Sequence, residues 1–170
     1  MKTLFLFAAL LMFAATSSFA QNTYDTTAPY KKTKALPQFK ILQGDSTWYT
    51  NSDLPKNKPV VLIYFSPECG HCQLTAKDLE SKMDKLQDVL FLMISYHTPQ
   101  QIQQFAKDYK LDHYKNVRLG RDPNYAIPSF YRVKFTPFMA VYDKNGKFVK
   151  AWEQGTDADT LIKMFHKQQS

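Results

Sequence analysis

The sequence contains only two cysteines, Cys69 and Cys72, among 170 residues. Two cysteines allow at most one internal disulfide, so the chain is not a small scaffold held together by several disulfides. They also cannot supply the four ligands of a structural zinc site by themselves. Since they stand only three positions apart, any chemistry that they perform is the chemistry of one pair.

Long apolar stretches are confined to the start of the chain. Lys2 precedes an apolar run from Leu4 to Ala15, and small residues follow before Gln21. This pattern predicts a cleavable secretory signal over residues 1–20. The run is shorter than the ~20 residues of a spanning helix, which makes a membrane anchor the less favoured alternative. No second such run follows and no cysteine lies near the cleavage point, so we expect neither a membrane span nor a lipid anchor in the mature chain.

Acidic residues are the minority among the charges, with 15 Asp and Glu against 22 Lys and Arg and a formal net charge of +7. The basic residues are scattered, and no run of five or more occurs. This distribution favours a solvated surface over a nucleic-acid patch, and an exported chain has little access to nucleic acid. We therefore expect no nucleic-acid partner.

The chain has no internal repeat and no interior linker, and it divides into a leader and one domain. Residues 21–36 are polar, contain Pro29 and show no hydrophobic period, which predicts a flexible leader. The remaining residues, 37–170, form one domain, and the chain is long enough to bury a full core.

Apolar patterns within this domain predict an ordered series of elements. The series is a hairpin of residues 39–42 and 47–49, a buried strand over 60–65, a helix over 72–86, a buried strand over 89–95, a helix from Pro99, a short strand plus loop within 112–130 with Pro128 in the loop, a hairpin of residues 138–142 and 147–152, and a closing helix over 157–166 capped by Thr156 and Asp159. The βαβα alternation predicts an α/β fold whose sheet is parallel first and ends in an antiparallel hairpin.

The two cysteines lie in Cys69-Gly70-His71-Cys72, directly after a buried strand and at the start of an amphipathic helix. A helix N-terminus offers unpaired N–H groups and a positive dipole end, which stabilise a thiolate at Cys69 and lower its pKa. Cys72 is one turn further on, near enough to attack a mixed disulfide and release the product. His71 can add positive charge or a hydrogen bond to the thiolate. The pattern therefore predicts a redox-active pair.

Other roles for the pair are less favoured. A structural disulfide would close only a four-residue loop and stabilise little. Covalent haem attachment requires a histidine after the second cysteine, and Gln73 stands there. Metal binding with a distant His97, His113 or His166 stays open, although no second close ligand pair supports it.

These features together resemble exported thioredoxin-fold thiol-disulfide oxidoreductases of the TlpA/ResA-like group, over about residues 37–168. The resemblance is carried by the strand at 60–65, the Cys-Gly-His-Cys centre, Thr136-Pro137 ahead of the second hairpin, and Gly155 before the last helix. It implies a thioredoxin-like fold, a central mixed sheet flanked by helices with an N-terminal β-hairpin extension. It also implies extra elements between the second strand and the proline loop.

The resemblance implies a Cys69–Cys72 disulfide in the oxidised form and a cis peptide bond at Pro137 facing the pair. The backbone of Thr136 would then be available to an extended substrate segment. Gly70 and His71 support the site as the dipeptide between the cysteines.

The sequence departs from thioredoxins at two places. Thioredoxins carry a buried acidic residue six positions before the first cysteine, where this chain has Ile63, so the proton of the resolving thiol needs another acceptor. Glu68 is the nearest carboxylate, although a solvated side chain is the more economical interpretation. The second departure is Gly-His between the cysteines, as in protein disulfide isomerases, which favours the thiolate and makes the disulfide more oxidising.

The leading hypothesis is thus a bacterial enzyme of the periplasm or another extracytoplasmic space that exchanges disulfides with cysteine-containing envelope proteins, more readily as a reductase. No metal or organic cofactor is implied, and a reductase in an oxidising space needs a membrane electron donor. The alternatives are an isomerase or oxidase, a non-catalytic binding domain, and a copper carrier with Met139 as a further ligand. A peroxidase is disfavoured, because the sequence lacks the Pro-x-x-x-Thr-x-x-Cys motif that such an enzyme requires.

Overall fold

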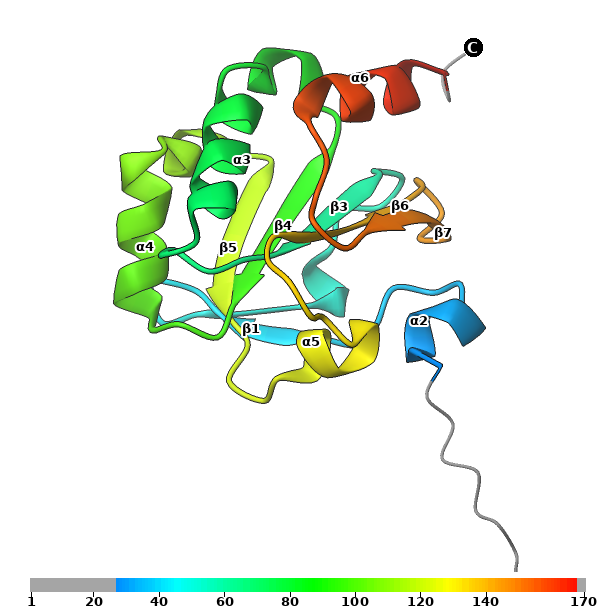
Figure 1. The fold of residues 1–170 in the computed structure, drawn as a ribbon, viewed down its shortest axis with the longest axis horizontal. Coiled ribbons are helices and arrows are strands. Elements are labelled where there is room, and N and C mark those ends of the chain that lie inside the picture. The colour runs from blue at the N-terminus through cyan, green and yellow to red at the C-terminus, as the bar shows by residue number, and fades with distance from the viewer. Residues whose placement is uncertain (1–26, 168–170) are drawn as a thin grey trace, which may run out of the picture.

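The computed structural model describes residues 27–167 as one seven-stranded sheet with helices on both faces (Figure 1). The predicted signal over residues 1–20 and the first part of the predicted leader lie outside the described residues. The elements, in chain order, are α2 (Pro29–Lys32), β1 (Lys40–Leu42), β2 (Trp48–Thr50), η1 (Asn51–Asp53), β3 (Val60–Tyr64), α3 (Gly70–Glu80), η2 (Met83–Leu86), β4 (Leu90–Ser95), α4 (Pro99–Asp108), η3 (Leu111–His113), β5 (Val117–Arg121), α5 (Ala126–Tyr131), β6 (Phe138–Tyr142), β7 (Phe148–Trp152) and α6 (Ala158–Lys167).

The sheet is mixed, in the order β2-β1-β5-β4-β3-β6-β7. β3, β4 and β5 are parallel neighbours, whereas β6 pairs antiparallel with β3, and β7 antiparallel with β6. The N-terminal hairpin of β1 and β2 extends the sheet beside β5. These pairings confirm the predicted α/β fold and both hairpins.

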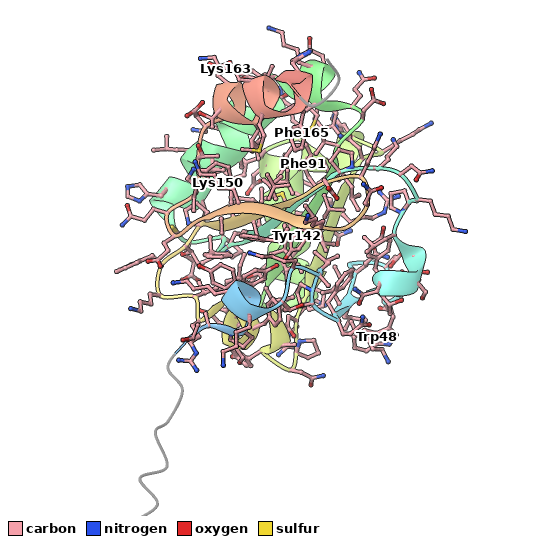
Figure 2. All side chains as sticks on the ribbon, turned by 90° about the vertical axis from the view of Figure 1, so that its right-hand side faces the viewer. Trp48, Phe91, Tyr142, Lys150, Lys163 and Phe165 are labelled. Carbon is pink, nitrogen blue, oxygen red and sulfur yellow. The ribbon has the colours of Figure 1, made fainter. Side chains whose placement is uncertain are left out.

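The core lies on both faces of the sheet, which explains the unbroken apolar runs of the central strands. All residues of β3, β4 and β6 are buried. Helices α3, α4 and α6 cover one face, and α2 and α5 lie on the other (Figure 1). Phe91 and Phe165 belong to the first layer and Tyr142 to the second (Figure 2). Within residues 27–167, no helix combines the length and apolar composition that crossing a membrane requires.

The expectation of a flexible leader is wrong for residues 27–36. Tyr30, on α2, packs against the rings of Tyr131, Phe138 and Phe148. The backbone N–H of Phe148 donates to the carbonyl of Lys34 at 2.6 Å, which continues the β7 edge. The segment is polar overall, but one aromatic side chain and its backbone suffice to hold it against the domain.

The predicted loop before the second hairpin is also wrong, because residues 126–131 form α5, with Pro128 in its first turn. Proline is tolerated there because the first N–H groups of a helix have no partner within the helix. The side chain of Asp122 accepts the N–H of Ile127 at 2.8 Å and so organises the start of this helix. Because the surrounding segment contains prolines and charged residues, its hydrophobic periodicity does not predict this helix.

Two smaller differences concern helix ends. The predicted helix over 72–86 begins earlier, at Gly70, and is interrupted after Glu80, although its apolar side chains remain buried through η2. The cap of α6 is Asp157, whose side chain accepts the N–H of Thr160 at 2.8 Å. The predicted partner Asp159 instead binds Lys82 at 2.8 Å.

Candidate active site

The cysteine pair lies at the carboxyl edge of the sheet, where the chain passes from β3 into α3. The N–H of Cys69 donates to the carbonyl of Ser66 at 3.1 Å, which forms the connecting turn. The side chain of Gln73 donates to the carbonyl of Pro67 at 3.0 Å and closes that turn from the helix side. As a result, Cys69 occupies the N-cap position itself, where the positive end of the helix dipole is strongest.

The two thiols differ in exposure and in acidity. Cys69 is partly exposed, whereas Cys72 is 2% exposed, and both are free thiols in this structure. Burial acts to raise the pKa of Cys69, but hydrogen bonds from the side chain and backbone of Cys72 outweigh it and hold that pKa below its ordinary value. Burial raises the pKa of Cys72 to about 12. The outer thiol is therefore the better nucleophile near neutral pH, and the inner thiol stays protonated.

The loop before β6 faces Cys69. The peptide bond between Thr136 and Pro137 is cis, as the family resemblance implied. The Cys69 thiol donates to the backbone carbonyl of Thr136, with 3.3 Å between Sγ and O. Gly155 packs behind the loop, since a Cβ atom at this position would lie 3.0 Å from the Pro137 ring. The structure thus brings Cys69, Thr136 and Pro137 together from segments far apart in the sequence.

The other predicted supporting residues are more loosely connected to the pair. Gly70, His71 and Glu68 are all exposed. The backbone N–H of His71 contributes to lowering the pKa of Cys69, whereas its ring has no hydrogen-bond or ion-pair partner within residues 27–167. Glu68 likewise has no such partner in the part of the chain that the structure describes, in agreement with a solvated side chain.

The position of the missing acid is apolar on all sides. Ile63 is 1% exposed and pairs with Met93 on β4 and Met139 on β6. Met139 is itself fully buried, in the same cluster as Cys72. No group of three or more His, Cys, Asp or Glu side chains within residues 27–167 is arranged to hold a metal ion.

One polar cluster at this edge was missed by the sequence reasoning. Ser95, His97 and Asp122 are the buried polar residues of the described chain. The sequence suggests His97 only as a distant metal ligand, but its Nδ1 lies 3.1 Å from the Ser95 hydroxyl oxygen. No local motif distinguishes these residues in the sequence, since they come from the ends of two different strands.

The fold and the site define a thioredoxin-like protein: a CxxC pair at a helix start, a cis-proline loop opposite it and a mixed sheet that positions both. The chain belongs to the AhpC/TSA family, whose model matches residues 33–162. No curated protein sequence matches it significantly.

Several solved structures share this fold. A secreted disulfide oxidoreductase of Mycobacterium tuberculosis, homologous to E. coli DsbE, is 23% identical with a TM-score of 0.63, covering 76% of this chain and 96% of its own. The exposed lipoprotein thioredoxin Etrx1 of Streptococcus pneumoniae is 27% identical with a TM-score of 0.57, covering 76% and 98%. Copper-bound ScoI of Arabidopsis thaliana is 19% identical with a TM-score of 0.59, covering 81% and 100%.

Proposed function

We propose that the chain is an extracytoplasmic thiol-disulfide oxidoreductase that reduces disulfides in cysteine-containing envelope proteins. The observation that carries this proposal is the asymmetry of the pair. Cys69 is accessible and has a lowered pKa beside the Thr136-Pro137 loop, whereas Cys72 is buried behind it with a raised pKa.

The reaction follows from this asymmetry. The Cys69 thiolate attacks one sulfur of a substrate disulfide, forms a mixed disulfide and releases the other substrate sulfur as a thiolate, which takes up a proton. Cys72 then loses its proton and attacks the Cys69 sulfur. The second substrate thiol leaves, and the enzyme retains a Cys69–Cys72 disulfide. A membrane electron donor would return the two electrons and two protons that the substrate has received.

The assignment of Cys72 as the resolving cysteine is tested by trapping. In Cys72→Ser the second step cannot occur, so mixed disulfides with substrate should accumulate and insulin reduction should stop. Cys69→Ser is the matched control and should trap nothing. Absence of trapped species in Cys72→Ser, together with unchanged insulin reduction, would sink the proposal.

The direction is tested by the reduction potential, measured by equilibration with glutathione. The TlpA/ResA-like framework supports a reductase, and a strongly reducing potential is expected. A potential as oxidising as that of an oxidase, on the order of −120 mV, would instead favour the isomerase or oxidase alternative that His71 suggests.

The proposed location rests on the N-terminal sequence and on two neighbours that are described as secreted or exposed. Expression in a bacterial host followed by cell fractionation tests it. The released protein should begin at Gln21. Recovery of an uncleaved chain in the cytoplasm would contradict both the signal and the location.

A further inference from the structure

Two exposed tyrosines lie side by side at the edge of the sheet that carries the cysteines. Tyr96 follows β4 and Tyr125 follows β5, and they are 43% and 53% exposed. Their rings stack with centroids 5.9 Å apart and planes inclined by 22°. Adjacent aromatic rings left open to water are typical of interaction surfaces.

The pair is held in place by the buried polar cluster beneath it. The N–H of Asp122 donates to the carbonyl of Ser95 at 2.8 Å, which ties the loop after β5 to the end of β4. The Asp122 carboxylate also accepts the N–H of Asn124 at 3.2 Å. The His97 ring lies 4.1 Å from the Tyr96 ring, between centroids. Both rings therefore stand on ordered loops, which lowers the entropy lost when a ligand binds.

Stability does not account for a tyrosine at position 125. Its φ of 52° is left-handed, a conformation that is unfavourable for tyrosine and that glycine or asparagine adopt more easily. The side chain is 53% exposed, so burial offsets little of that cost. The ring is therefore available for contact with another molecule.

The tyrosine pair adjoins the redox site through Tyr64. This residue ends β3, on the segment that leads to Cys69, and it pairs with Phe138, the residue after Pro137. Tyr64 is itself buried, and its partner on β4, Ile94, stands two residues before Tyr96 and accepts the N–H of Phe65 at 2.9 Å. The tyrosine pair and the turn that carries Cys69 therefore leave the sheet at the same edge, from neighbouring strands.

The electrostatics favour a neutral side chain on this surface. The ring contacts of Tyr96 and Tyr125 are with each other and with His97, whereas Lys40 lies over the equally exposed Trp48 at 4.4 Å. The Asp122 carboxylate behind the pair disfavours an anion. The two rings themselves offer an apolar, polarisable surface, which aromatic and aliphatic side chains cover best.

We propose that Tyr96 and Tyr125 form a second contact for the polypeptide that Cys69 attacks, and that they bind a neutral aromatic or aliphatic side chain near the substrate cysteine. This inference rests on the proposed function. It makes unfolded polypeptides with apolar residues near their cysteines the preferred substrates, because such residues are exposed only before folding.

The test compares two disulfide-bonded peptides that differ only in having leucine and phenylalanine or serine around the cysteines, with oxidised glutathione as a third substrate. Tyr96→Ala and Tyr125→Asn remove the rings, and asparagine tolerates the left-handed backbone. We expect kcat/KM for the apolar peptide to fall about tenfold through KM, while the other two substrates change less than about twofold. Trp48→Ala, which removes an exposed aromatic ring from the outermost strand β2, is the control and should change none.

Unchanged kinetics of both variants on the apolar peptide, or an equal loss on all three substrates, would overturn the inference and leave the proposed function intact. If the wild-type protein reduces none of the three substrates, the proposed function fails and the inference fails with it. Thermal unfolding confirms that each variant is folded, and should Tyr125→Asn not fold, Tyr96→Ala decides alone.

Discussion

Selective alkylation of the two cysteines tests the acidity difference on which the proposed chemistry depends. A thiol with a pKa of about 12 is ionised in roughly one molecule in 10⁵ at pH 7. A cysteine at its ordinary pKa of about 8.5 is ionised in roughly three molecules in 10², and the pKa of Cys69 is held below its ordinary value, so that its ionised fraction is larger still. The thousandfold difference is partly offset because more basic thiolates are more nucleophilic, with a Brønsted slope of about 0.5. A preference for Cys69 of at least about 30-fold remains, and burial of Cys72 increases it.

The assay treats the reduced protein with iodoacetamide at a series of pH values and locates the adduct by fragmentation of the peptide that carries both cysteines. The Cys69 rate should rise with pH and level off at a lower pH than the rate of an unperturbed cysteine does, because its pKa is lowered. Cys72→Ala removes a hydrogen bond to the thiolate and should move this midpoint to higher pH, while Cys72→Ser retains a donor and should move it less. Comparable labelling of the two thiols, or a midpoint that Cys72→Ala leaves in place, would refute the reasoning.

Three further predictions concern the surroundings of the pair. Gly155→Ala and Gly146→Ala both place alanine at φ +73°, but only Gly155→Ala brings a Cβ atom against Pro137. In urea unfolding, Gly155→Ala should therefore be less stable than Gly146→Ala by about 1 kcal/mol. Equal losses of stability in the two variants would contradict that contact. Asp78→Ala removes the acceptor of the Ala158 N–H at 2.7 Å and should lower the free energy of unfolding by about 1–2 kcal/mol, with Asp78→Asn as the milder control; no difference between the two would argue against the cap. Equilibrium dialysis with Cu(I) should show no binding, and retention of the ion by the cysteine pair would revive the copper-carrier alternative.

The local sequence was sufficient to predict an element wherever one physical requirement dominated the residue pattern. The run at 60–65 could only be a strand covered on both faces, and Asn145-Gly146 sets the turn of the second hairpin, with Gly146 at φ +73°. The same logic failed where tertiary contacts supplied what the local pattern lacked. α5 depends on the Asp122 side chain, four residues before the helix, and α2 depends on the aromatic pocket that receives Tyr30.

The sequence by itself determined that the two cysteines act as one pair at a helix start, because three-residue spacing after a buried strand requires no distant contact. Only the tertiary structure decided which segments meet that pair. The approach of Thr136 to Cys69 joins residues 67 positions apart, and the stacking of Tyr96 on Tyr125 joins the ends of two parallel strands. Such contacts follow from the order and register of the strands, which hydrophobic periodicity does not encode. The spacing and position of the two cysteines therefore located the reactive pair, and the order of the strands determined which residues surround it.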